Sequence, residues 1–138
     1  MATRRQRSFR FDPDMLVRLE SHARETGLTQ TALAERYIEE GIRQEQHWGI
    51  VFVTEAAGRR ARIGGTGLDV WEIVSIVQDN HGSVAEAAEH LAIPERMVHD
   101  AMRYYADFPD EIDDWIAEND RYYEEELTRQ KKVAEHLA

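Results

Sequence analysis

Residues 4–13 read RRQRSFRFDP, and this stretch decides how the rest of the chain is interpreted. At the period of two that a strand imposes, successive side chains point to opposite faces. One face then carries two aromatic rings, and the other carries only hydrogen-bonding groups. The faces are Arg7, Phe9 and Phe11 on one side, and Gln6, Ser8 and Arg10 on the other. The stretch is therefore predicted to be a short strand with one apolar and one polar face.

A short strand is not stable alone in water, because half of its backbone groups have no partner. The simplest remedy is antiparallel pairing with the same strand of a second copy. The resulting ribbon would present two copies each of Gln6, Ser8 and Arg10, and the major groove of DNA accepts a two-stranded ribbon. Arginine can bind guanine and glutamine can bind adenine by two hydrogen bonds, so these three residues are the predicted base-reading side chains.

Two helices are predicted to follow the strand. Asp12-Pro13 is a good helix start, Gly27 is a typical end at about Thr26, and Thr29 suits the cap of a second helix over about residues 30–46. Two helices of this length leave an incomplete core, which again predicts a dimer. The expected dimer core consists of Phe9, Phe11, Leu16, Leu19, Leu33, Tyr37, Ile38 and Ile42.

Residues 5–46 resemble the ribbon-helix-helix family of DNA-binding proteins, the Arc/CopG class, which includes VapB-like antitoxins. The resemblance rests on the alternation ending in Phe9-Arg10-Phe11, the Asp12-Pro13-Asp14 helix start, the Gly27-Leu28-Thr29 corner and the apolar spacing of the second helix. It implies a homodimer on a palindromic operator in double-stranded DNA. The expected phosphate contacts are Arg4 and Arg5 on the arm, and Thr29, Gln30 and Thr31 at the second helix start, where free N–H groups favour an anion.

Charge is distributed very unevenly along the 138 residues, whose net charge is −10. Residues 1–11 carry four arginines and no acid, whereas residues 105–127 carry ten acids and only Arg121. The first segment suits phosphate, and the second suits a basic protein. The chain has no cysteine, no membrane-length apolar run and no signal-peptide core, so we expect a cytoplasmic protein without membrane contact.

The middle of the chain predicts a hairpin and then three helices. The hairpin pairs residues 50–53 with residues 61–63, and Gly64-Gly65-Thr66-Gly67 is read as a turn, because it lacks the lysine and spacing of a phosphate loop. Asp69 and Ser83 cap the next two helices, and the last covers about residues 95–106.

The last two of these helices have the outline of a helix-turn-helix. A second DNA site is possible there, but the mixed charges of its second helix favour a packing or protein-docking role. The side chains concerned are Glu95, Arg96, His99, Asp100 and Arg103.

Residues 63–107 also resemble a small helical domain common in bacterial antitoxins. The shared features are an Ile-Gly-Gly-Thr-Gly turn, an apolar helix and a Ser-capped pair of helices, although Gly67 and Asp69 stand where Arg and Pro are often found. Such domains often accompany PIN-like ribonuclease toxins, and the resemblance implies a partner of that kind.

A long acidic helix is predicted from Pro109 onward. Its apolar stripe is either core or a surface that lies in a groove on a partner, and aromatic side chains are typical anchors of interfaces. The expected toxin-binding residues are Ile112, Trp115, Ile116, Tyr122, Tyr123 and Leu127.

The whole chain is thus predicted to be mainly α-helical, with a ribbon-helix-helix in residues 1–47, a small helical domain with a leading hairpin in 48–108 and a toxin-binding helix in 109–138. No spacing of histidines or carboxylates matches a metal site or a catalytic constellation, so neither an enzyme nor a cofactor is expected. The favoured function is an antitoxin that represses its own transcription. The alternatives are a stand-alone repressor, whose C-terminal part serves oligomerisation or effector binding, and an adaptor that binds no nucleic acid.

Overall fold

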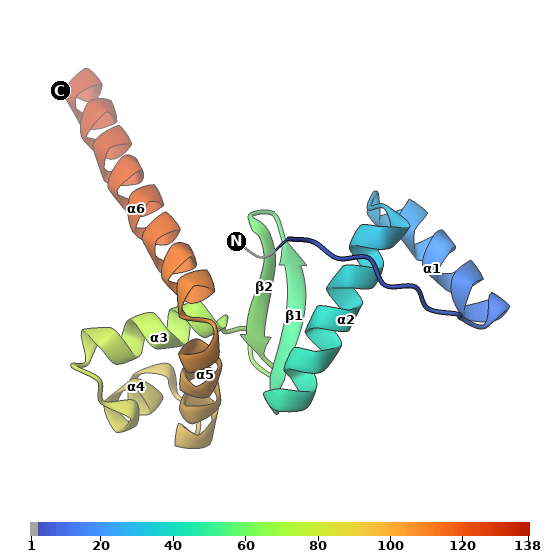
Figure 1. Cartoon of the computed structure of the whole chain (residues 1–138). Coiled ribbons are helices and arrows are strands. Elements are labelled where there is room, and N and C mark those ends of the chain that lie inside the picture. Colours follow the sequence, from blue (N-terminus) through green and yellow to red (C-terminus); the bar gives the residue numbers. More distant parts are fainter. Residues whose placement is uncertain (1–2) are drawn as a thin grey trace. The chain divides into compact units, whose positions relative to one another are not determined.

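The computed structural model describes residues 3–138, and it is mainly helical with one two-stranded antiparallel sheet (Figure 1). This confirms the predicted fold class at its coarsest level. The chain forms two compact units, one up to Ile42 and one from Arg43 to Ala138, which are described separately. The elements of the described residues are α1 (Pro13–Thr26), α2 (Gln30–Gln46), β1 (Ile50–Glu55), β2 (Gly58–Ile63), α3 (Val70–Asp79), α4 (Val84–Leu91), α5 (Glu95–Asp107) and α6 (Pro109–Leu137).

The N-terminal unit contains α1 and most of α2, and both helices have the predicted bounds. Gly27 ends α1 in the left-handed conformation at φ 72°, and the Thr29 hydroxyl accepts a hydrogen bond from the Ala32 N–H at 3.0 Å. Asp12 is the N-cap of α1, as predicted, but its side chain forms no capping hydrogen bond. Asp12 has the extended conformation that a following proline imposes, and only its carbonyl accepts a hydrogen bond, from the Leu16 N–H at 3.1 Å.

Residues 3–12 have no regular secondary structure in the single chain. The strand predicted here is therefore not formed, and no strand of the described residues pairs with this segment. Residues 3–11 therefore lead into α1 without a backbone ladder.

The C-terminal unit begins, after the end of α2, with the predicted hairpin. Its strands pair from Ile50↔Ile63 to Glu55↔Gly58, so only Ala56 and Ala57 form the turn. Gly64 to Gly67 form a turn after β2, as predicted, and the Gly64 N–H donates to the Gly49 carbonyl at 2.8 Å.

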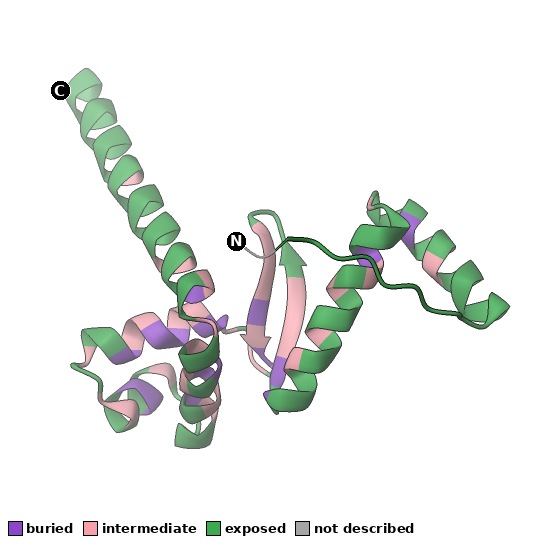
Figure 2. Cartoon of the chain, in the orientation of Figure 1, coloured by how far each residue is buried: buried purple, intermediate pink, exposed green. Residues whose placement is uncertain are grey.

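Helices α3, α4 and α5 surround the main core of this unit (Figure 2). The predicted caps are present: the Asp69 N–H donates to the Glu72 carboxylate at 3.2 Å, and the Glu86 N–H donates to the Ser83 hydroxyl at 3.2 Å. The fully buried side chains of the core include Ile63, Val70, Ile73, Val74, Val98, Ala101, Tyr104 and Ile112.

Helix α6 has two different halves. Its first turns pack against α3 and α5, where Ile112 is buried and Ile116 borders the core. Beyond Ile116, almost every residue is exposed, and the helix projects away from the compact base of the unit (Figures 1 and 2). The unit thus has a compact base and a long uncovered helical extension.

Candidate functional site

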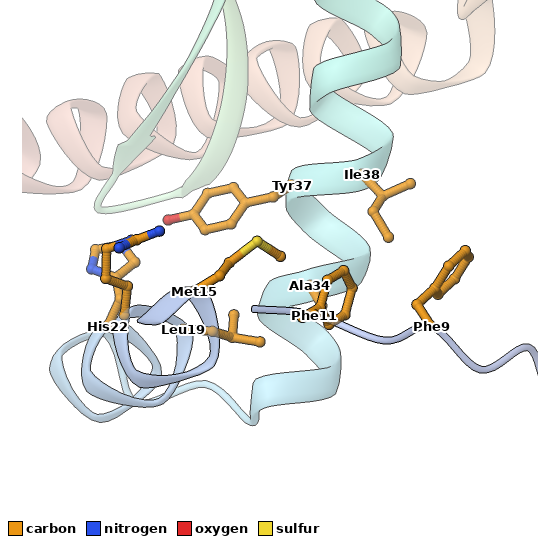
Figure 3. A pocket seen from close by; sticks show the side chains of 9 residues that line it. Phe9, Phe11, Met15, Leu19, His22, Ala34, Tyr37 and Ile38 are labelled. Atoms are coloured by element: carbon orange, nitrogen blue, oxygen red, sulfur yellow. The ribbon is translucent and has the colours of Figure 1, made fainter. Parts of the chain in front are cut away.

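An apolar groove of about 670 Å³ lies in the N-terminal unit. Figure 3 shows that its walls come from three parts: the segment before α1, helix α1 and helix α2. The groove is almost free of polar surface and open to solvent. It is lined by Phe9, Phe11, Met15, Arg18, Leu19, His22, Ala34, Tyr37 and Ile38.

The structure brings most of the predicted dimer core to this groove but leaves it uncovered. Only Leu33 is buried and Leu19 half-buried, whereas the exposed fractions of Phe9, Tyr37 and Ile38 are 61%, 45% and 52%. The remaining members, Phe11, Leu16 and Ile42, are also exposed. Large apolar side chains gathered on one face of so small a unit leave much of its core incomplete.

Two groove residues, Arg18 and His22, were not predicted from the sequence. His22 stacks against Tyr37 with 6.0 Å between the ring centroids, and its Nδ1 lies 3.2 Å from a Glu25 oxygen. Helical spacing could have placed His22 in the groove, because His22 comes three residues after Leu19 and therefore lies on the same face of α1.

The predicted base-reading residues lie on the open segment before α1. Gln6, Ser8 and Arg10 are all exposed, while Phe9 and Phe11 stack on each other at 6.1 Å on the groove side. The two aromatic side chains of this segment thus line the groove, and the three polar ones do not.

The predicted phosphate contacts are exposed, but two of them already have partners. Arg4 forms an ion pair with Glu35 of α2, and the Thr29 hydroxyl is used by its own helix cap. Arg5, in the segment before α1, is exposed. Gln30 and Thr31, at the start of α2, are exposed as well. The backbone N–H groups of Gln30 and Thr31, rather than the Thr29 hydroxyl, are thus the groups at this corner that suit an anion.

The predicted toxin-binding stripe of α6 is divided by the fold. Ile112 is buried, and Trp115 and Ile116 are half-buried at the base of the C-terminal unit. Tyr122, Tyr123 and Leu127 are 66%, 63% and 41% exposed on the uncovered half. The first three side chains serve the fold, and the last three are accessible.

A polar cluster that the sequence did not reveal links the end of α2 to α5 and α6. Arg43 donates to the Tyr104 hydroxyl at 2.7 Å and to a Glu111 oxygen at 2.8 Å, and Tyr104 donates to the other Glu111 oxygen at 2.6 Å. The Arg43 guanidinium also lies 3.7 Å from the Phe108 ring centroid. Burial raises the pKa of the Tyr104 hydroxyl well above its usual value, the bond to Glu111 raises it further, and Arg43 opposes both effects.

Asp69 is the centre of a second such cluster. Its carboxylate lies 2.8 Å from Arg62 and 3.2 Å from Arg60, and it accepts a hydrogen bond from the Trp71 indole at 3.2 Å. Hydrogen bonds to Asp69 and Glu55 raise the pKa of the Arg62 guanidinium. The sequence identified Asp69 only as a helix cap, yet it also forms ion pairs with two arginines of β2, of which Arg62 is paired with Glu55 as well.

The helix-turn-helix outline of α4 and α5 is present, with a left-handed Ala92 in its turn. Glu95, Arg96, His99 and Arg103 are exposed on α5, and Asp100 is half-buried. Their opposing charges remain unfavourable for a phosphate surface.

Among residues 3–138, no three His, Asp or Glu side chains are grouped so that they would hold a metal ion. In the same residues, no helix has the length and apolar character needed to cross a membrane. Comparison with known proteins found no matching family model, curated protein or solved structure.

Proposed function

We propose that this chain is the antitoxin of a toxin–antitoxin pair: a homodimeric, sequence-specific DNA-binding repressor whose C-terminal unit neutralises a ribonuclease toxin. The observation that supports this proposal most is the uncovered apolar groove. Beside it lies an arginine-rich segment that pairs with no strand among residues 3–138. The protein would act in the cytoplasm, where both its operator and its toxin would be found.

The groove supports a homodimer. Within the described part of the N-terminal unit, only Ala23 and Leu33 are buried, too little to stabilise so short a chain. A second copy would cover the exposed Phe9, Tyr37 and Ile38 with the same side chains, as a two-fold interface requires.

The segment before α1 supports DNA binding. Pairing residues 4–11 with the same residues of a second copy would satisfy the open backbone and complete a two-stranded ribbon. Its outer face would carry two copies each of Gln6, Ser8 and Arg10, and the major groove of DNA admits such a ribbon. Arg5 and the N–H groups at the start of α2 would contact phosphates on either side.

The outer half of α6 supports a protein partner. Residues 117–127 carry five Asp or Glu side chains and one Arg, and Tyr122, Tyr123 and Leu127 are exposed among them. A ribonuclease needs a positive surface for its substrate, and an acidic helix with aromatic anchors is complementary to such a surface.

The DNA-binding half is tested with the DNA upstream of the protein's own gene. Sedimentation should give a dimer, and a gel shift should show sequence-specific retardation that weakens steeply with salt. A monomer, or equal affinity for unrelated DNA, would contradict the proposal.

The toxin-binding half is tested by co-expression with the neighbouring open reading frame. The full chain should relieve growth arrest, and a chain ending at Asn119 should not, although it keeps Ile112 and Ile116 in the core and still binds the operator. A chain that binds its operator but has no toxic neighbour would instead be a stand-alone repressor.

A further inference from the structure

A second, smaller hollow of about 170 Å³ lies beside the base of α6, entirely within the C-terminal unit. Its walls come from the hairpin turn, β2, α3 and α6, and we call it the aromatic hollow. It is lined by Ala57, Arg60, Trp71, Trp115, Glu118, Asn119 and Tyr122.

Three side chains of the aromatic hollow, Trp115, Arg60 and Trp71, are held by contacts within the unit. Trp115 lies so close to the hairpin that a Cβ at Gly58 would be 3.3 Å from its ring, and the Arg60 guanidinium lies 5.3 Å from the Trp115 ring centroid. The Trp71 indole is held by its hydrogen bond to Asp69. A preformed pocket loses less conformational entropy when a ligand binds.

The charges around the hollow determine what it can hold. Arg60 already occupies a face of Trp115 and is paired with Asp69, so a second cation would meet a positive group inside. The remaining surface is mostly aromatic and apolar, which favours an uncharged, apolar side chain. Glu118 lines the hollow itself, and Asp120, Glu124 and Glu125 follow it along α6, so these carboxylates favour basic neighbours of that side chain.

We propose that the aromatic hollow takes up an apolar side chain of a basic protein segment, which lies along the acidic half of α6. This inference rests on the proposed protein partner and specifies how α6 and the base of the unit recognise it together. Tyr122 would connect the two, since it lines the hollow and is 66% exposed on α6.

The test uses the full-length protein and two short lysine-rich peptides, one with a central phenylalanine and one with serine in its place. Binding is followed by NMR of the indole N–H signals of Trp71 and Trp115, with Trp48, which does not line the hollow, as an internal control. The phenylalanine peptide should bind at least about tenfold more tightly, and should shift Trp71 and Trp115 but not Trp48.

Two matched variants locate the effect. Tyr122→Ala should abolish the preference for phenylalanine, whereas Tyr123→Ala, which removes an equally exposed ring outside the hollow, should preserve it. Ala57→Leu, which fills the hollow without removing a wall, should act like Tyr122→Ala.

Equal binding of the two peptides, or equal effects of the Tyr122 and Tyr123 variants, would overturn the assignment. This assay needs neither operator nor toxin. Its failure would therefore exclude the hollow as an anchoring site but leave the growth-rescue and gel-shift tests of the proposed function intact.

Discussion

At the scale of single residues, the surroundings of Tyr104 determine both the hydrogen bonds and the protonation of its hydroxyl. It is fully buried, accepts a hydrogen bond from Arg43 and donates one to Glu111. Removing the Tyr104 hydroxyl would leave the Arg43–Glu111 bond in place, but each of these two side chains would lose one hydrogen-bond partner in partly buried surroundings.

Tyr104→Phe should lower the free energy of unfolding of the C-terminal unit by about 1–3 kcal/mol, measured by urea denaturation. Tyr105→Phe is the matched control. Tyr105 is the next residue of α5, makes a similar bond of 2.7 Å to Asp113, and lies at the surface, so its loss should cost less. Equal losses would show that the buried cluster contributes nothing beyond an ordinary surface hydrogen bond.

Stability should also depend on pH through the same hydroxyl. Burial and the bond to Glu111 raise the pKa of Tyr104 above its ordinary value of 10.0, so the folded state favours the protonated form. The stabilisation is fully present below pH 10 and is lost as the pH rises above 10. Denaturation curves measured from neutral pH upward should show this loss in the wild type and a smaller one in Tyr104→Phe.

Arg10 is the residue on which the DNA-binding proposal is most directly tested. Arg10→Ala should weaken operator binding by about 1–3 kcal/mol and relax the preference at one base position, measured by fluorescence anisotropy with single-base operator variants. Arg129→Ala removes an equally exposed arginine from α6 and should leave the affinity unchanged. A uniform loss across all sequences would assign Arg10 to phosphate contact instead.

At the scale of elements, most helix boundaries were predictable because their signals are local. Pro13 and Gly27 delimit α1, Thr29 caps α2, and the pairs Asp69–Glu72 and Ser83–Glu86 start α3 and α4. Each signal lies within three or four residues of the backbone that it fixes.

The interactions between elements were not predictable from such local signals. Arg43 is 61 residues from Tyr104 and 68 from Glu111, and no spacing rule connects them. Likewise, the periodicity of α6 predicted its apolar face, but the point near Ile116 where that face leaves the core depends on the ends of α3 and α5.

The hairpin turn illustrates how one glycine positions two elements. Gly58 has φ 134°, and a Cβ there would lie 3.3 Å from the Trp115 ring. Gly58→Ala should therefore destabilise the C-terminal unit by about 1–3 kcal/mol in thermal or urea melts. Gly67→Ala, where a Cβ meets nothing within 4 Å, should stay within about 0.5 kcal/mol of the wild type.

At the scale of the whole molecule, the apolar groove makes assembly the central question. Ile38→Glu places a charge among Phe9, Phe11 and Tyr37 and should convert the proposed dimer to a monomer, because a buried unpaired carboxylate is very costly. Val17→Glu is the control, since Val17 is 64% exposed but does not line the groove. Sedimentation of both variants would show whether the groove is the dimer interface. If both variants remained dimers, the interface would lie elsewhere.

The bare outer half of α6 has a consequence for the lifetime of the free protein. A helix without tertiary support opens readily and often, and opened backbone is what proteases cleave. An occupant lying along α6 would close this entry point, so the chain would survive in bound form and be cleared when alone. Its abundance would then follow the supply of its binding partner without any further sensor.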